Sequence, residues 1–157
     1  MHAKVKPHPC RLWLDGEYVR YDVEGQLAWR LAIGEIRLIG EYTTDCGPLA
    51  DDYFLCFATG AGRWWEASYY SDEFMRGFAA IGERLDADLR LGLAGSTDYA
   101  SRILWPAHLA GEPMFTFTAL QGGSLWERVR RFFGPTMEWT LSEVAREALD
   151  SDDAGSS

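Results

Sequence analysis

Four carboxylates and a cysteine lie close together in the stretch EYTTDCGPLADDYF, residues 41–54. The acids are Glu41, Asp45, Asp51 and Asp52, and neither lysine nor arginine occurs among them. One interpretation is a loop for Ca²⁺ or Mg²⁺, because these ions prefer carboxylate oxygens. The spacing does not support it, since an EF-hand has acids at alternating positions, a central glycine and a distal glutamate. We interpret the stretch instead as a solvated acidic loop before a strand, which could dock a basic partner.

The three cysteines do not predict a zinc site. Such a site needs clustered cysteine and histidine, and the chain contains neither a CxxC nor an HxxxH pair. A nucleophilic Cys46 would need a base beside it, and His108 is the one histidine beyond the first nine residues. We favour a small loop residue at Cys46 and core packing for Cys56. We therefore expect no metal and no cofactor, and we assign no catalytic residue.

A carboxylate beside two indole rings is another candidate for acid–base chemistry. Glu66 directly follows Trp64 and Trp65. An apolar environment raises the pKa of a carboxyl group, as in the general acid of a glycoside hydrolase. The alternative is an exposed glutamate near the end of a strand with one tryptophan buried, and we favour this alternative.

The segment SRILWPAHLAGEP, residues 101–113, has little periodicity after Trp105. One interpretation is a binding loop, covering 105–113, that presents Trp105 and His108 to a ligand. The other is a long connection held to the core by its tryptophan and leucine side chains. We favour the second interpretation for the segment itself, and the structure of residues 87–112 is not fixed by the pattern.

Composition narrows the class of protein. The 157 residues are 47% apolar, which is typical of a folded domain, and the net charge of −9 argues against general binding of nucleic acid or anionic membranes. The only lysines, Lys4 and Lys6, leave none for a P-loop or a Schiff base in the domain. No apolar run reaches the roughly 20 residues of a membrane span. An odd number of cysteines and no secretory signal favour a cytoplasmic protein with reduced thiols.

Positive charge gathers locally in one place, at Arg128, Arg130 and Arg131, with Arg102 as a possible further member. Arg128 and Arg131 are three apart on a predicted helix and can face the same way. They could contact a phosphate or carboxylate, but we favour pairing with Glu127 and the acidic C-terminal residues.

The pattern predicts strands first and helices later. Alternation of apolar and polar residues predicts strands at 11–14, 17–23, 27–32, 34–44, 52–59 and 63–70. Asp15-Gly16 and Glu24-Gly25 are the expected hairpin turns.

Helical periodicity begins at Ser71, the expected cap of a helix with Phe74, Phe78, Ile81 and Leu85 on one face. Gly77 would allow this helix to pack closely.

The remaining segments give weaker signals. Residues 88–94 could form a strand or continue the helix, whereas 113–120 alternates like a strand. Further helices are predicted at 96–106, ending before Pro106, and at 124–133. A capping box of Thr140 and Glu143 would begin the last helix, at 140–149.

These elements predict one α+β domain over residues 10–150, preceded by an extension (1–9) and followed by a disordered acidic tail (151–157). About six antiparallel strands in a sheet or partly closed barrel, capped by an amphipathic helix, are followed by a helical C-terminal part. In element order alone, residues 11–86 resemble the pleckstrin-homology-like barrel. The resemblance rests on no motif, and residues 38–60 lack the basic loops of lipid-binding members. No function follows from it.

Two functional hypotheses remain. The first is a non-catalytic interaction protein that uses the acidic face around 41–52 and the 105–113 loop, for example as a regulator of a basic protein. The second is a small-molecule-binding protein or hydrolase whose pocket is lined by Trp64, Trp65 and Trp105, with Glu66 and His108 as its polar groups. Convergence of these residues in one cavity would support the second hypothesis. The sequence sets no oligomeric state.

Overall fold

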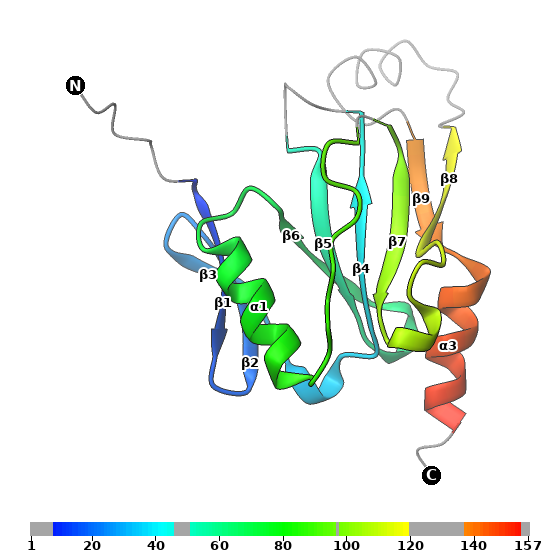
Figure 1. Ribbon diagram of the computed structural model, residues 1–157, viewed down its shortest axis with the longest axis horizontal. Coiled ribbons are helices and arrows are strands. Elements are labelled where there is room, and N and C mark those ends of the chain that lie inside the picture. The colour runs from blue at the N-terminus through cyan, green and yellow to red at the C-terminus, as the bar shows by residue number, and fades with distance from the viewer. Residues whose placement is uncertain (1–7, 46–50, 97, 120–136, 155–157) are drawn as a thin grey trace.

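The computed structural model describes residues 8–45, 51–96, 98–119 and 137–154. This part of the chain contains nine strands in three antiparallel sheets, together with two α-helices (Figure 1). The predicted α+β class, with a sheet covered by an amphipathic helix, is confirmed. None of the described sheets closes into a barrel, so the likeness to the pleckstrin-homology-like barrel goes no further than element order.

The first sheet has three strands in the order β1-β2-β3. They are β1 (Cys10–Asp15), β2 (Tyr18–Val23) and β3 (Gln26–Ala32). Asp15 pairs with Tyr18, so the first hairpin turns at Gly16 and Glu17, one residue later than predicted. The second turn is the predicted Glu24-Gly25, where both residues have positive φ, 51° and 78°.

The second sheet has four strands in the order β6-β5-β4-β7. They are β4 (Leu38–Thr43), β5 (Tyr53–Ala58), β6 (Trp64–Ser68) and β7 (Ala100–Trp105). The first three were predicted. The helix predicted at 96–106 is wrong, because Ala100–Trp105 pairs with β4 as an edge strand. A local capping signal was outweighed by the backbone hydrogen bonds that β4 offers.

The third sheet pairs β8 (Phe115–Ala119), the predicted strand, with β9 (Met137–Leu141). The helix α3 (Glu143–Ala154) follows. Its cap is Ser142, whose hydroxyl oxygen accepts a hydrogen bond from the Ala145 amide at 3.1 Å, so the predicted cap at Thr140 is wrong. α3 extends into the segment expected to be a disordered tail. The helix predicted at 124–133, with its arginine cluster, lies outside the described residues.

The helix α1 (Phe74–Arg84) buries Phe74, Phe78 and Ile81, which confirms the predicted apolar stripe. It begins after Ser71, whose hydroxyl donates to the Ser68 carbonyl instead of capping the helix. Gly77 gives the predicted close packing, since a Cβ there would lie 2.8 Å from the carbonyl oxygen of Leu12. Neither described helix has the length and apolar character needed to span a membrane.

The four-stranded sheet carries one apolar core on each face. The first core lies between this sheet, the three-stranded sheet and α1, and includes Leu12, Val19, Leu31, Ile39, Phe57 and Ile81. The second lies between the sheet, the β8–β9 pair and α3, and includes Leu38, Tyr42, Cys56, Ile103, Met114 and Leu149. In Figure 1 the four-stranded sheet stands in the middle, with α1 and α3 on opposite sides.

Residues 85–96 cross the first face of the four-stranded sheet without joining it (Figure 1). Leu85, Leu89 and Leu91 pack on the first core. The alternatives predicted for 88–94, a strand or a continued helix, are therefore both wrong, because the segment is not helical and has no strand partner.

Candidate functional site

Glu41 is the first residue of the acidic stretch but is not on the surface. Its side chain is 0% exposed, on the first face of the four-stranded sheet. The carboxylate accepts hydrogen bonds from the Tyr53 hydroxyl and from the Gly92 amide, the latter at 2.7 Å. Arg102, its cross-strand neighbour on β7, places Nε 3.3 Å from the carboxylate. The prediction that Glu41 belongs to an exposed acidic face is wrong.

This buried group ties the crossing segment to the sheet. Arg102 also donates to the Arg90 carbonyl at 2.8 Å, and a Cβ on Gly92 would lie 2.3 Å from the guanidinium carbon of Arg102. Burial, together with the hydrogen bond to the Glu41 carboxylate, raises the pKa of Tyr53 well above its ordinary value. Both carboxylate oxygens of Glu41 have donors, so the arrangement holds the fold together and leaves no oxygen for a substrate.

The other acids of the stretch differ in their surroundings. Asp51 accepts a hydrogen bond from the Ser68 hydroxyl at 2.6 Å and lies 3.3 Å from His8 Nε2. Asp52 accepts one from the Tyr70 hydroxyl at 2.5 Å, and this bond, with some burial, raises the pKa of Tyr70 to about 12. Asp45 is exposed, and Cys46 lies outside the described residues. The acidic surface is therefore smaller than the sequence suggests.

Glu66 occupies the second face of the same sheet. Trp64 Nε1 donates to one carboxylate oxygen at 3.0 Å, and the Tyr42 hydroxyl donates to the other at 2.9 Å. Cys56, its neighbour on β5, is fully buried, and burial raises the pKa of this thiol well above its ordinary value. Glu66 is thus a partly buried, hydrogen-bonded residue rather than a free one, and Cys56 is a core residue.

The three tryptophans of the predicted pocket do not converge. Trp64 packs against the second core, whereas Trp65 and Trp105 pack against the first. Successive residues of a strand point to opposite faces, so the sheet itself separates Trp64 from Trp65. His108 is exposed and belongs to the short helix that follows the end of β7. A cavity shared by all of these residues is not formed.

The predicted 105–113 loop does form one wall of a groove. The short helix η3 (Ala107–Leu109) faces α3 across a hollow of about 280 Å³. Its lining residues are Arg37, Leu38, Pro106, His108, Leu109, Val144, Glu147, Ala148 and Ser151. The leucines, Val144 and Ala148 give an apolar floor, and Arg37, His108 and Glu147 supply polar groups of both signs. The sequence indicated the loop but not the opposite wall.

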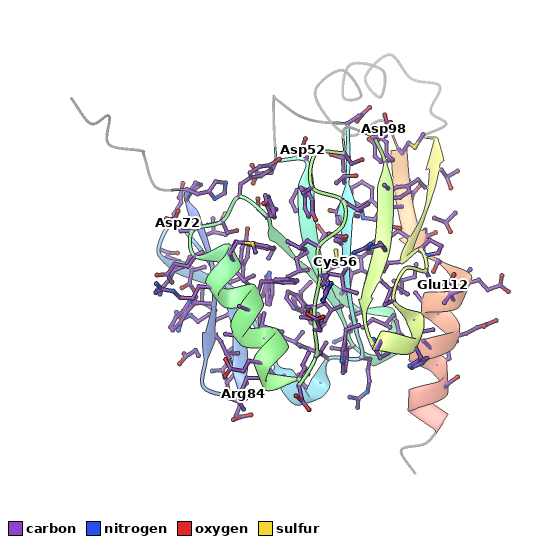
Figure 2. The ribbon with its side chains drawn as sticks, viewed as in Figure 1. Asp52, Cys56, Asp72, Arg84, Asp98 and Glu112 are labelled. Carbon is purple, nitrogen blue, oxygen red and sulfur yellow. The ribbon has the colours of Figure 1, made fainter. Side chains whose placement is uncertain are left out.

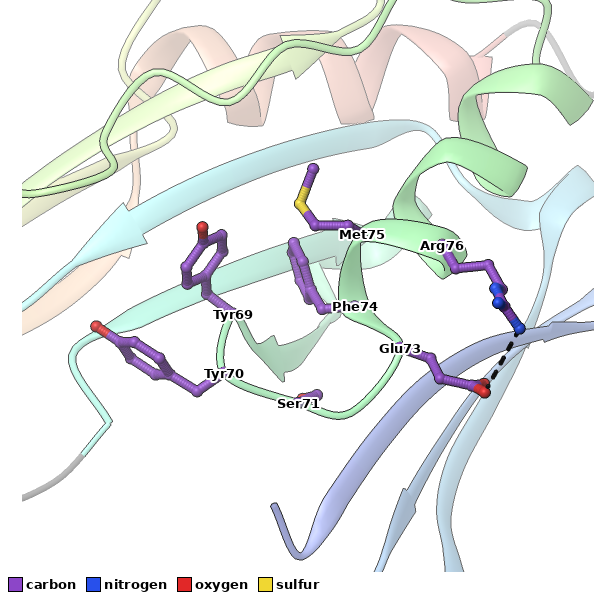
Figure 3. Close-up of a pocket in the computed structure, with 7 residues that line it drawn as sticks. All are labelled: Tyr69, Tyr70, Ser71, Glu73, Phe74, Met75 and Arg76. Atoms are coloured by element: carbon purple, nitrogen blue, oxygen red, sulfur yellow. Dashed lines mark ion pairs between the residues drawn. The ribbon is translucent and has the colours of Figure 1, made fainter. Parts of the chain in front are cut away.

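A second hollow, of about 470 Å³, lies at the start of α1 (Figure 3). Tyr69, Tyr70 and Phe74 contribute aromatic rings, and Glu73 pairs with Arg76 at 3.7 Å on its rim. Tyr70 and Met75 are 47% and 57% exposed. The sequence analysis missed this hollow. The sequence signal that could have indicated it is Met75, a large apolar residue of α1 that lies outside the buried stripe of this helix.

Within the described ranges, no three His, Cys, Asp or Glu side chains are grouped so as to hold a metal ion. No protein-family model, curated protein or solved structure matches the chain.

Proposed function

We propose that this protein is a non-catalytic binding protein, and that the groove between η3 and α3 receives an apolar side chain of a protein or peptide partner. The observation that carries this proposal is the hollow of about 280 Å³ with an apolar floor. Pockets for drug-sized ligands have volumes of about 300–1,000 Å³. The groove lies just below that range and suits a single anchoring side chain, the usual centre of a protein interface.

The rim of the groove fits the same role. Arg37 and Glu147 place both signs of charge around the apolar floor, and His108 adds a polar ring. Interfaces commonly surround a buried apolar centre with such a polar rim, which fixes orientation more than it adds affinity. A partner residue flanked by polar groups would match this arrangement.

The acidic end of the sheet is a separate place. β4 begins at Leu38, which lines the groove, and ends at Thr43, beside the acidic residues. Six strand residues span about 20 Å. Asp52 and Asp98 mark this far end in Figure 2. Docking of a basic protein there stays a prediction, now resting on the exposed Asp45 and Asp98.

A cytoplasmic location also stays a prediction.

The alternative of a hydrolase or a small-molecule pocket has less support. It needs Glu66 and His108 to act together with three tryptophans, but Trp65 and Trp105 face the opposite core. Both oxygens of Glu66 already accept hydrogen bonds from Trp64 and Tyr42. A general acid or base instead needs a geometry in which it reaches the substrate.

Selection of random peptides on the full chain tests the proposal. Ala148→Trp would fill the groove, because Ala148 is part of its lining. We expect selected peptides to share an apolar residue and to lose about tenfold or more in affinity for this variant. Ala79→Trp, at an exposed position of α1, is the matched control and should bind normally. Equal binding to both variants would contradict the proposal.

A further inference from the structure

Strand β3 has one free edge. It pairs with β2 along one side, and within the described part of the chain no backbone hydrogen bond reaches its other side. Its contact with β6 is made by a side chain, since Trp29 Nε1 donates to the Glu66 carbonyl at 3.0 Å. An edge of this kind presents N–H and C=O groups to which another strand can pair.

Few of the usual protections against pairing are present on β3. The strand has seven residues, QLAWRLA, with no proline and a single charge, Arg30. Proteins commonly blunt an exposed edge with prolines, charges, β-bulges, a covering segment or a very short strand. β3 has one of these, a register shift at Ala28 between Leu27 and Trp29, so its regular edge runs from Trp29 to Ala32.

One large exposed apolar side chain lies on β3 itself, that of Leu27, which is 49% exposed. Tyr18 and Val23, each 39% exposed, belong to β2, one strand farther from the edge, and point to opposite faces of the sheet because they are five residues apart. A partner strand on the edge of β3 would therefore cover Leu27 rather than these two.

Charge distinguishes Arg30 from the other arginines of the sheet. Arg20 pairs with Asp22 at 2.9 Å, and Arg11 pairs with Glu73 at 2.8 Å. The Arg30 guanidinium lies 4.5 Å from the ring centroid of Tyr18, and among the described residues it has no ion-pair partner. In a chain with a net charge of −9, this is an uncompensated cation beside an unpaired edge.

A second copy of the chain would not complement this surface. Symmetric pairing of two β3 strands would put both Arg30 side chains on the same strip, next to Arg20 of each sheet, and the strand itself, QLAWRLA, contains no acid to pair with them. A strand with a carboxylate opposite Arg30 makes the favourable cross-strand pair instead.

We propose that β3 accepts an extended acidic segment of a partner protein as a fourth strand. The segment forms backbone hydrogen bonds with the outer edge of β3, places a carboxylate opposite Arg30, and packs an apolar side chain beside Leu27. This surface belongs to the three-stranded sheet and is independent of the groove, because α3 lies on the other side of the molecule (Figure 1).

The probe is a short, end-blocked, fluorescent peptide in which glutamate alternates with valine, and its partner peptide has lysine in place of glutamate. We expect the full chain to bind the acidic peptide at least about tenfold more tightly, and bound peptide to slow amide hydrogen exchange in residues 26–32. Arg30→Glu should reverse the preference, which would also show that the variant folds. Arg146→Glu, at an exposed position of α3, should keep it.

Three results would overturn the proposal. The first is equal or absent binding of the two peptides. The second is protection from exchange outside residues 26–32. The third is concentration-dependent protection of β3 without peptide, because that would mean a second copy occupies the edge.

Discussion

Each face of the four-stranded sheet carries one carboxylate, and the hydrogen-bond and charge partners of the two carboxylates differ. Glu41, on the first face, is fully buried and has a cation, Arg102, as well as donors from Tyr53 and Gly92. Glu66, on the second face, is only partly buried and accepts from two neutral donors. The difference agrees with the cost of burial, since a fully desolvated charge needs a counter-charge and a partly solvated one does not.

The comparison also bears on function. On both faces the carboxylate oxygens are already engaged, so the acids that attract attention in the sequence stabilise the structure. The features that remain open to a partner, the groove and the free edge of β3, contain few of these acids. We therefore separate the residues that hold this protein together from those that bind.

The largest effect should follow removal of the cation on the first face. Arg102→Met leaves Glu41 buried without its charge partner, and we expect a loss of about 3 kcal/mol in the free energy of unfolding. Urea denaturation measures it. The double variant Arg102→Met with Glu41→Gln should recover part of the loss, because no buried charge then remains. A single variant no less stable than the natural protein would break the comparison.

A smaller effect is expected on the second face. Glu66→Gln keeps one acceptor oxygen but turns an amide nitrogen either toward Trp64 Nε1, which can only donate, or toward the Tyr42 hydroxyl, which must then give up its own donated bond. We expect a loss of about 1–2 kcal/mol in the same denaturation experiment. If Glu66→Gln destabilises the protein more than Arg102→Met does, then burial of Glu41 is not the more costly of the two, and the comparison is wrong.

The smallest expected effect is a change in how the free energy of unfolding depends on pH in the alkaline range. The pKa values of Tyr21 and Tyr70 are raised from 10.0 to about 12, Tyr21 chiefly by burial and Tyr70 by its bond to Asp52, and that of Tyr53 is raised further. The unfolded chain then releases these protons first, so stability is complete below pH 10 and falls as pH rises above it. Tyr53→Phe should cost about 1 kcal/mol at neutral pH and make that fall shallower. An unchanged slope would argue against the buried Tyr53–Glu41 bond.

Much of the fold could be read from periodicity. The alternation of β4 and β5 and the stripe of α1 are local patterns, and the structure has them where they were expected. β7 was mistaken for a helix because its strand character depends on pairing with β4, which one sequence does not reveal. The burial of Glu41 was missed for the same reason, since Arg102 belongs to that misassigned segment.

The candidate sites show the same limit. The 105–113 loop was predicted to bind, and it does line a groove, but the opposite wall comes from α3, far along the chain. The predicted tryptophan pocket does not form, because Trp64 and Trp65 are adjacent on a strand and their side chains must point to opposite faces of the sheet. No sequence pattern indicated Arg30 as a binding residue, since its lack of an ion pair is visible only in the three-dimensional structure.

The most direct test of the separation between structural acids and binding surfaces uses one peptide selected on the full chain. Its affinity would be measured for Ala148→Trp, which fills the groove, and for Glu66→Gln, which alters the partly buried carboxylate of the second face. The account predicts a loss of about tenfold or more for Ala148→Trp and no change for Glu66→Gln. Binding that survives in Ala148→Trp but is lost in Glu66→Gln would contradict it and move the site to the tryptophan-flanked carboxylate.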